Sequence, residues 1–232
     1  MSESDFLDGK LLLIDKPLGW SSFQAVNKIK WVIRTKFNLK KIKVGHAGTL
    51  DPLATGLLLI CTGKLTKTLN ELQGQVKEYT GTIFLGATTP SYDRETQVDQ
   101  EFPTEHITDA LLHQTTESFL GKIQQLPPIF SALKKDGKRL YEFAREGESV
   151  EIKPRTIEIS KFDITRIDLP EIEFRVVCSK GTYIRSLAHD YGKALASGAH
   201  LSTLRRTKIG DYFVDKAITP MDFETSMLSK PK

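Results

Sequence analysis

The stretch TIEISKFDITRIDLPEIEFRVVCS, residues 156–179, decides the fold class that the sequence predicts. It reads as two β-strands in succession, and the second has apolar side chains at every other position: Ile172, Phe174, Val176 and Cys178. Alternation of this kind is typical of a strand with one buried face. Two strands joined by so short a connection pair as hairpin neighbours, so the stretch predicts an antiparallel sheet.

Strands and helices follow one another irregularly on both sides of this stretch. Strand patterns occupy residues 10–15, 57–61, 77–86 and 201–209, and helical patterns occupy residues 21–36, 65–72, 108–120, 140–145 and 183–196. Without regular alternation of strand and helix, a doubly wound fold is disfavoured. We therefore expect an α+β fold with a mixed, mostly antiparallel central sheet flanked by helices, in one domain spanning residues 1–232.

Composition excludes several classes of protein. The 232 residues are 39% hydrophobic and 27% charged, and no apolar run approaches the ~20 residues of a membrane span. The acidic N-terminus, residues 1–9, is unlike a secretory signal. Cys61 and Cys178 form no Cys-x-x-Cys pair, and no histidine has a ligand-spaced cysteine partner, so we expect buried free thiols, no metal site and a cytoplasmic protein.

Positive charge is concentrated in a few segments, although the formal net charge is only +4. Residues 24–50 contain no acidic side chain and seven basic ones: Lys28, Lys30, Arg34, Lys36, Lys40, Lys41 and Lys43. Smaller basic clusters lie at residues 134–139 and 205–208. Segregated charge can form a phosphate-facing surface. The alternative is that each cluster is a solvated surface that binds no ligand. A single cluster, taken alone, favours this alternative.

The segment VGHAGTLDPLATG, residues 44–56, is rich in glycine and proline, and we expect it to be loop rather than helix or strand. Pro52 biases Asp51 toward an extended backbone, and the flanking glycines permit tight turns and close approach of a ligand. A carboxylate is thereby held in a fixed pose, with the imidazole of His46 five residues away. An ordinary Asp-Pro turn is the structural alternative.

This loop resembles the signature of the TruB family, the bacterial tRNA pseudouridine-55 synthases. Other segments resemble the remaining family motifs in the same order along the chain: residues 12–22 with Asp15-Lys16-Pro17, residues 77–86, residues 127–145, residues 178–185, and residues 199–206. The matches together span roughly residues 10 to 210. The chain is therefore identified as similar to this family, which implies the pseudouridine synthase fold.

The resemblance implies an isomerase that converts uridine 55 in the T-loop of tRNA to pseudouridine. The reaction exchanges one glycosidic bond for another, so it needs neither a redox cofactor nor a metal. By the resemblance Asp51 is the catalytic carboxylate, Tyr79 stacks on the target base, and Arg185 pairs with the catalytic aspartate. Without it, Tyr79 would be interpreted as a strand-packing aromatic and Arg185 as a cation at a helix start.

Four further residues match family positions that bind the RNA. Tyr183 and Leu204 correspond to residues lining the uracil pocket, His46 to the residue that fills the space left by the flipped nucleotide, and Lys16 to a lysine near the site. Flipping is required because a stacked base hides its reacting atoms. We expect a monomer that binds the T-arm stem-loop of tRNA, with no membrane and no protein partner implied.

The sequence departs from the family pattern in two places. Asp93 aligns with a family aspartate, but its neighbours in residues 88–96 are altered. Many members also carry a C-terminal PUA domain, which we do not expect in this chain. Two alternatives stay open: a non-catalytic chaperone that binds and refolds tRNA, and the same isomerisation on another RNA.

Overall fold

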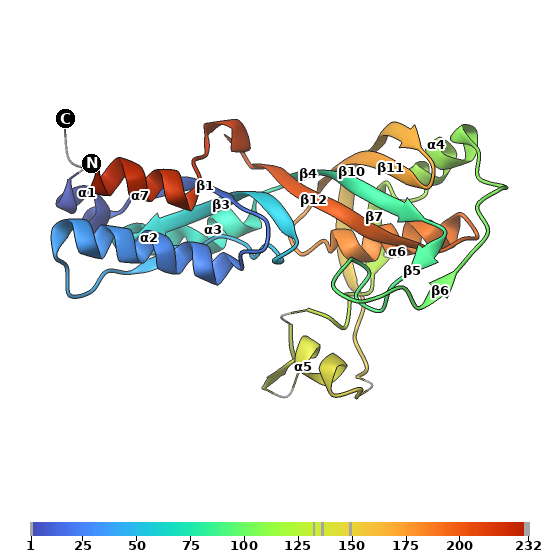
Figure 1. Ribbon diagram of the computed structural model, residues 1–232, viewed down its shortest axis with the longest axis horizontal. Coiled ribbons are helices and arrows are strands. Elements are labelled where there is room, and N and C mark those ends of the chain that lie inside the picture. Colours follow the sequence, from blue (N-terminus) through green and yellow to red (C-terminus); the bar gives the residue numbers. More distant parts are fainter. Residues whose placement is uncertain (1, 132, 136, 149, 230–232) are drawn as a thin grey trace. The chain divides into compact units, whose positions relative to one another are not determined.

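The computed structural model describes residues 2–131, 133–135, 137–148 and 150–229. They form two compact units (Figure 1). Unit 1 consists of the chain up to Tyr79 together with the chain from Leu204, and unit 2 consists of Thr80–Thr203. Strands β4 (Lys77–Leu85) and β12 (Ala199–Ile209) each have residues in both units. The prediction of a single domain stays a prediction, and each unit is described separately.

Unit 1 is built around strand β3 (Ala54–Thr62). Strand β1 (Leu11–Lys16) pairs with it antiparallel, as does the short β2 (Val44–His46), and the end of β12 pairs with it in parallel. β13 (Tyr212–Phe213) pairs with the last residues of β12. Because β3 is covered on both faces, all but one of its residues up to Cys61 are buried, as expected of a central strand.

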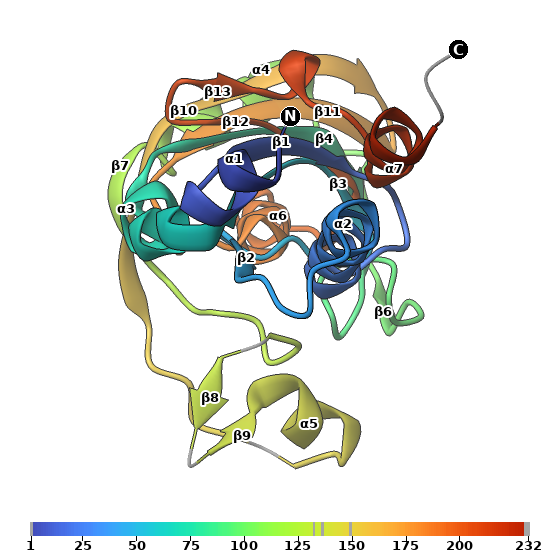
Figure 2. The ribbon, with the colours of Figure 1, turned by 90° about the vertical axis from the view of Figure 1, so that its left-hand side faces the viewer.

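Helix α2 (Ser22–Phe37) supplies much of the core of unit 1. Ser21 and Gln24 form a capping box that begins the helix, and Asn38, with φ 51°, ends it. The apolar positions of the helix recur every three or four residues, so they face one side. Val26, Ile29 and Ile33 on that side pack in one core with Ile14 of β1, Ile60 of β3 and Phe223 of α7 (Pro220–Leu228). Figure 2 shows α2 and α7 side by side.

The short helices of unit 1 are α1 (Glu3–Asp8), the 3-10 helix η1 (Gly63–Thr68), α3 (Leu69–Gly74) and the 3-10 helix η2 (Val214–Lys216). The sequence predicted one helix over residues 65–72, whereas the chain forms η1 and then α3. Helices α1 and α7 were not predicted. Each is short and capped by a serine or threonine, Ser2 and Thr219, which is a local signal that apolar periodicity alone does not reveal.

The prediction that residues 44–56 are entirely loop is wrong at both ends. Residues 44–46 belong to β2, and residues 54–56 begin β3. Gly56 has φ +102°, and a Cβ there would lie 2.3 Å from the backbone oxygen of Arg206. Glycine is therefore required because two strand backbones approach closely at this point, a role it can take inside a strand.

Unit 2 contains the strand order β12, β4, β11 (Glu171–Cys178), β10 (Arg155–Asp168) and β7 (Gly121–Gln125). The predicted hairpin over residues 156–179 is confirmed, because β10 and β11 pair antiparallel along most of their length. Helices α4 (Asp109–Glu117) and α6 (Ile184–Ala194) belong to this unit, and aromatic rings of Phe162, Phe174 and Tyr191 pack in its core.

Three small elements complete unit 2. Strands β8 (Lys134–Lys135) and β9 (Lys138–Arg139) pair with each other and lead into α5 (Leu140–Arg145), and β5 (Ala87–Thr88) pairs with β6 (Gln100–Glu101). The fold class is confirmed: the chain is α+β, and its sheet is mostly antiparallel with a parallel pair at β3 and β12. Both cysteines are buried and neither is in a disulfide, as predicted. None of the helices described is long and apolar enough to cross a membrane.

Candidate active site

The Asp51 loop of unit 1, residues 47–53, is fixed at several points by its own unit. The Ala47 amide donates to the carbonyl of Leu59 (2.9 Å), and the Leu50 amide donates to Ser22 Oγ (2.8 Å). The hydroxyl of Ser22 in turn donates to the Leu50 carbonyl (3.1 Å). The loop is therefore tied to β3 and to the first residue of α2, which holds Asp51 in a defined place.

Arg206 on β12 supports the same loop from within. Its side chain is 1% exposed, Nε donates to the carbonyl of Leu57 (2.7 Å), and a terminal nitrogen donates to the carbonyl of Gly48 (3.0 Å). The sequence placed Arg206 in a basic cluster that could face phosphate, and this interpretation is wrong because the side chain is buried. Its neighbour Arg205 forms an ion pair with Asp15 (2.7 Å).

Lys16 ends β1 and is fully buried. Its Nζ donates to the carbonyls of Pro17 (3.0 Å) and Trp20 (2.6 Å). Burial lowers the pKa of Lys16 to about 8, while the negative charge of Asp51 acts in the opposite direction. Lys16 and Asp51 are thus brought close enough to interact electrostatically.

The other predicted residues of unit 1 lie on its strands. His46 is in β2, burial lowers its pKa, and its Nδ1 is buried without a hydrogen bond to any described residue. Tyr79 is a buried residue of β4. Leu204 on β12 pairs with Ala54, three residues beyond Asp51, and Thr55 Oγ1 donates to its carbonyl (3.4 Å).

Arg185 and Tyr183 belong to unit 2, at the start of α6. The Arg185 and Asp93 side chains are 5% and 7% exposed, and Arg185 Nε lies 3.5 Å from Asp93 Oδ2. Another guanidinium nitrogen donates to the carbonyl of Ser91 (3.2 Å). Tyr183 is anchored by Gln125, which accepts from its amide (2.8 Å) and donates to its carbonyl (3.0 Å). The predicted pairing of Arg185 with Asp51 stays a prediction.

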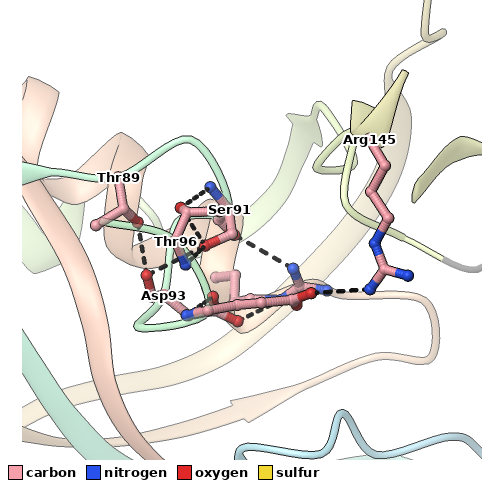
Figure 3. A network of polar contacts seen from close by, with 7 residues as sticks. Thr89, Ser91, Asp93, Thr96 and Arg145 are labelled. Atoms are coloured by element: carbon pink, nitrogen blue, oxygen red, sulfur yellow. Dashed lines mark hydrogen bonds and ion pairs between the residues drawn. The ribbon is translucent and has the colours of Figure 1, made fainter. Parts of the chain in front are cut away.

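The Asp93 loop, residues 89–96, holds its shape through short polar side chains (Figure 3). Thr89 Oγ1 donates to the carbonyl of Asp93 (2.7 Å), and the hydroxyls of Ser91 and Thr96 lie 2.8 Å apart. The Glu95 amide donates to Asp93 Oδ1 (2.9 Å). Serine and threonine favour such local backbone contacts. The altered motif therefore still presents a buried carboxylate to Arg185.

Two supporting residues escaped the sequence analysis. Gln125 carries no motif, and only its place before the Pro127-Pro128 break could have drawn attention to it. Arg206 lies in a run of two arginines, where a buried and an exposed position look alike in sequence. In the part of the chain that the structure describes, no group of three or more histidine, cysteine or acidic side chains could hold a metal ion.

Comparison with protein families gives two matches that together cover most of the chain. A model for the N-terminal domain of the TruB family pseudouridylate synthases matches residues 34–184, and a model for the tRNA pseudouridylate synthase B C-terminal domain matches residues 185–230. The chain belongs to the TruB family. The Asp51 loop lies within the residues that match the N-terminal domain model of this family.

Individual TruB relatives match along nearly the whole chain. A protein of Flavobacterium johnsoniae named tRNA pseudouridine synthase B is 68% identical over 98% of this chain and all of its own length. A protein of the same name from Psychrobacter cryohalolentis is 44% identical over 95% of this chain and 61% of its own. A crystal structure of a Cbf5–Nop10–Gar1 complex matches with a TM-score of 0.69 and 29% identity, over 94% of this chain and 54% of that chain.

Proposed function

We propose that this TruB chain isomerises uridine to pseudouridine at position 55 in the T-loop of tRNA, with Asp51 as the catalytic carboxylate. The observation that carries the proposal is the Asp51 loop, which unit 1 fixes between β3 and the first residue of α2. The tRNA pseudouridine synthases B that match nearly all of the chain support the substrate.

The reaction breaks the bond from N1 to C1′, turns the uracil and joins C5 to C1′. The C5 proton is released and N1 takes up a proton, so the atoms balance without any co-reactant. An ionised carboxylate can act in it as a nucleophile or as a base. The positive charge of Lys16 interacts electrostatically with the Asp51 carboxylate. Arg185 is proposed as a second stabilising cation, and Tyr79 as the ring that stacks on the flipped base.

His46, Tyr183, Leu204 and Lys16 are proposed to bind the substrate. His46 would occupy the space vacated by the flipped nucleotide, and Tyr183 and Leu204 would line the uracil pocket. Extruding a stacked base costs a few kcal/mol, which stacking and pocket contacts offset in part. We further propose that the protein acts as a monomer on the T-arm stem-loop.

Tritium release from unmodified tRNA labelled at uracil C5 tests the proposal. Asp51→Asn keeps the size of the side chain and removes its charge, so we expect tRNA binding to persist while tritium release falls by at least about a thousandfold. Asp211→Asn, at an exposed position outside the family motifs, is the matched control and should release tritium like the wild type.

The outcomes separate the alternatives. Binding by the wild type without tritium release from any tRNA would indicate a tRNA-binding chaperone. Release from another RNA, with none from the T-loop, would indicate the same chemistry on a different substrate. Full release by Asp51→Asn would remove Asp51 from its proposed role.

A further inference from the structure

Helix α6 is contacted at two adjacent turns by two consecutive residues of the Asp93 loop. Arg185 and His189 are four residues apart in α6, so their side chains lie on the same face of the helix. Asp93 lies against Arg185, at 3.5 Å. The ring of Tyr92 stacks on His189, with centroids 3.8 Å apart and planes inclined by 13°. The loop is thus docked on α6 through both residues.

Tyr92 adopts a backbone conformation that residues other than glycine rarely adopt. Its φ is +63°, in the left-handed region, and such a conformation persists in a bulky residue only where its surroundings fix it. The amide of Tyr92 donates to the carbonyl of Thr89 (3.1 Å), and its carbonyl accepts from the amide of Leu201 (2.9 Å). The stacked ring is the third contact that holds this residue.

His189 offers the ring of Tyr92 a neutral aromatic surface. Burial lowers the pKa of His189 to about 4, with Lys193 acting in the same direction and Asp99 in the opposite one. Its Nδ1 is buried and has no hydrogen-bond partner among the described residues. A polar atom left unpaired inside a protein has a cost. The histidine is therefore held there by its stacking contact.

The hydrogen bonds within the Asp93 loop have a different role from that of the stacked rings. Those of Thr89, Ser91 and Thr96 close the loop upon itself and fix its internal shape. They do not set where it lies on α6. The backbone of Tyr92 and Asp93 is fixed to Leu201 of β12. On the side of α6, the placement depends on the contacts of Arg185 with Ser91 and Asp93 and on the Tyr92 ring. At 3.5 Å the ion pair is longer than a strong charged hydrogen bond, so a small shift of the loop weakens it.

We propose that the Tyr92–His189 stack is a positioning device, which holds Asp93 against Arg185 and thereby fixes the Arg185 guanidinium for the reaction. Neither ring needs to touch the RNA in this role. The inference rests on the proposed function for its catalytic consequence, while its structural part concerns the free protein alone.

Two measurements on the full chain test it. The first follows hydrogen exchange of the Arg185 Nε–H by nuclear magnetic resonance, without RNA. His189→Ala should speed this exchange by at least about fivefold, because the loop no longer confines the guanidinium. His189→Phe keeps a flat aromatic ring without ring nitrogens, and it should retain the slow exchange of the wild type.

The second measurement is single-turnover tritium release at saturating tRNA, with the dissociation constant determined in parallel. We expect His189→Ala to slow release by about tenfold or more and to change the dissociation constant by less than about twofold, as misplacement of a reacting group predicts. His189→Phe should restore the rate to within about threefold of the wild type. A loss of packing alone would also slow release in Phe119→Ala, so that variant separates the two explanations.

Phe119→Ala is the matched control. Phe119 packs against α6 at Tyr191, with ring centroids 5.9 Å apart, and against Phe162 of β10. It should leave both Arg185 exchange and the single-turnover rate near the wild type. Unchanged exchange and rate in His189→Ala, or equal losses in His189→Ala and Phe119→Ala, would overturn the inference. Absence of release in the wild type would instead reject the proposed function, and the exchange result would still decide the structural claim.

Discussion

Arg206 illustrates how a single buried side chain can determine the form of the Asp51 loop. Its guanidinium satisfies two carbonyls, at Leu57 and Gly48, that lie on either side of Asp51 in the chain. A buried backbone carbonyl without a donor has a desolvation cost. The charge has a structural role here, which the sequence alone could not distinguish from a phosphate-binding one.

Arg206→Lys should destabilise unit 1, because lysine cannot span both carbonyls with a planar fork. We expect the free energy of unfolding, measured in urea, to fall by about 2–4 kcal/mol. Arg205→Lys is the matched control. Because it alters a part-exposed ion pair, it should lower the free energy of unfolding by less than about 1 kcal/mol. Equal small losses in both variants would contradict the buried role of Arg206.

His189 should make the protein acid-sensitive. Its pKa is about 4 in the folded protein, below its ordinary value of 6.5, so the unfolded chain binds a proton that the folded one does not between these pH values. Stability from this residue is therefore complete above pH 6.5 and is lost as pH falls toward 4. Allowing for its half-buried position, the loss is about 1–3 kcal/mol.

Denaturant unfolding of the wild type and His189→Phe at several pH values checks this. The phenylalanine variant has no titrating group at this position. Its free energy of unfolding should therefore rise relative to that of the wild type as the pH is lowered. Parallel stability curves from pH 7 to pH 4 would show that the histidine titrates alike in the folded and unfolded chains.

At the scale of the element, prediction succeeded where a pattern repeated over many residues. The strands at 156–179 and helix α2 follow from alternation and from helical spacing, supported by four buried positions in each strand and six in the helix. It failed for β2 and the start of β3, because glycine in a strand and glycine in a loop look the same until the neighbouring backbone of β12 is known. The Tyr92–His189 stack also escaped prediction, since the residues are 97 positions apart.

The basic segment around α2 should set the salt dependence of tRNA binding. Its lysines at positions 36, 40 and 41 are exposed, whereas Lys28 forms an ion pair with Glu224 (2.7 Å) and lies over the Trp31 ring. With about five phosphates contacted, the log–log slope of affinity against salt would be roughly −3 to −4. Replacing Lys36, Lys40 and Lys41 by glutamine should reduce its magnitude by about 2.

Fluorescence titrations of labelled tRNA at several salt concentrations measure this slope. Lys28→Gln is the control, because its charge is already paired within unit 1, and it should leave the slope nearly unchanged. A triple variant with the slope of the wild type would place these lysines outside the RNA interface.

At the scale of the whole molecule, the family assignment followed from ordered motifs, whereas the division into two units did not. The junction between the two family matches, at residues 184 and 185, falls at the first turn of α6 inside unit 2. It also separates β12 from β3, its partner in unit 1. A boundary between family matches is therefore not a boundary between compact parts.

Fragments 1–184 and 185–232 should accordingly fail to fold separately. Each loses strand partners whose backbone groups would be left unpaired. We expect no cooperative thermal transition by circular dichroism in fragment 185–232, against a sharp one in the full chain. A cooperative transition in that fragment would show that it carries a core of its own.

Unit 1 is formed by two separate stretches of the chain, and this has a consequence for the order of events during synthesis. Unit 2 is one continuous segment, so all of it has been translated once residue 203 is added. The first stretch of unit 1 has been complete since residue 79 was added. Residues 54–56 of β3 nevertheless lack their strand partner until residues 204–206 of β12 emerge from the ribosome. Unit 1 is thus begun before unit 2 and completed after it, and the nascent chain exposes an unpaired stretch of strand edge throughout that interval.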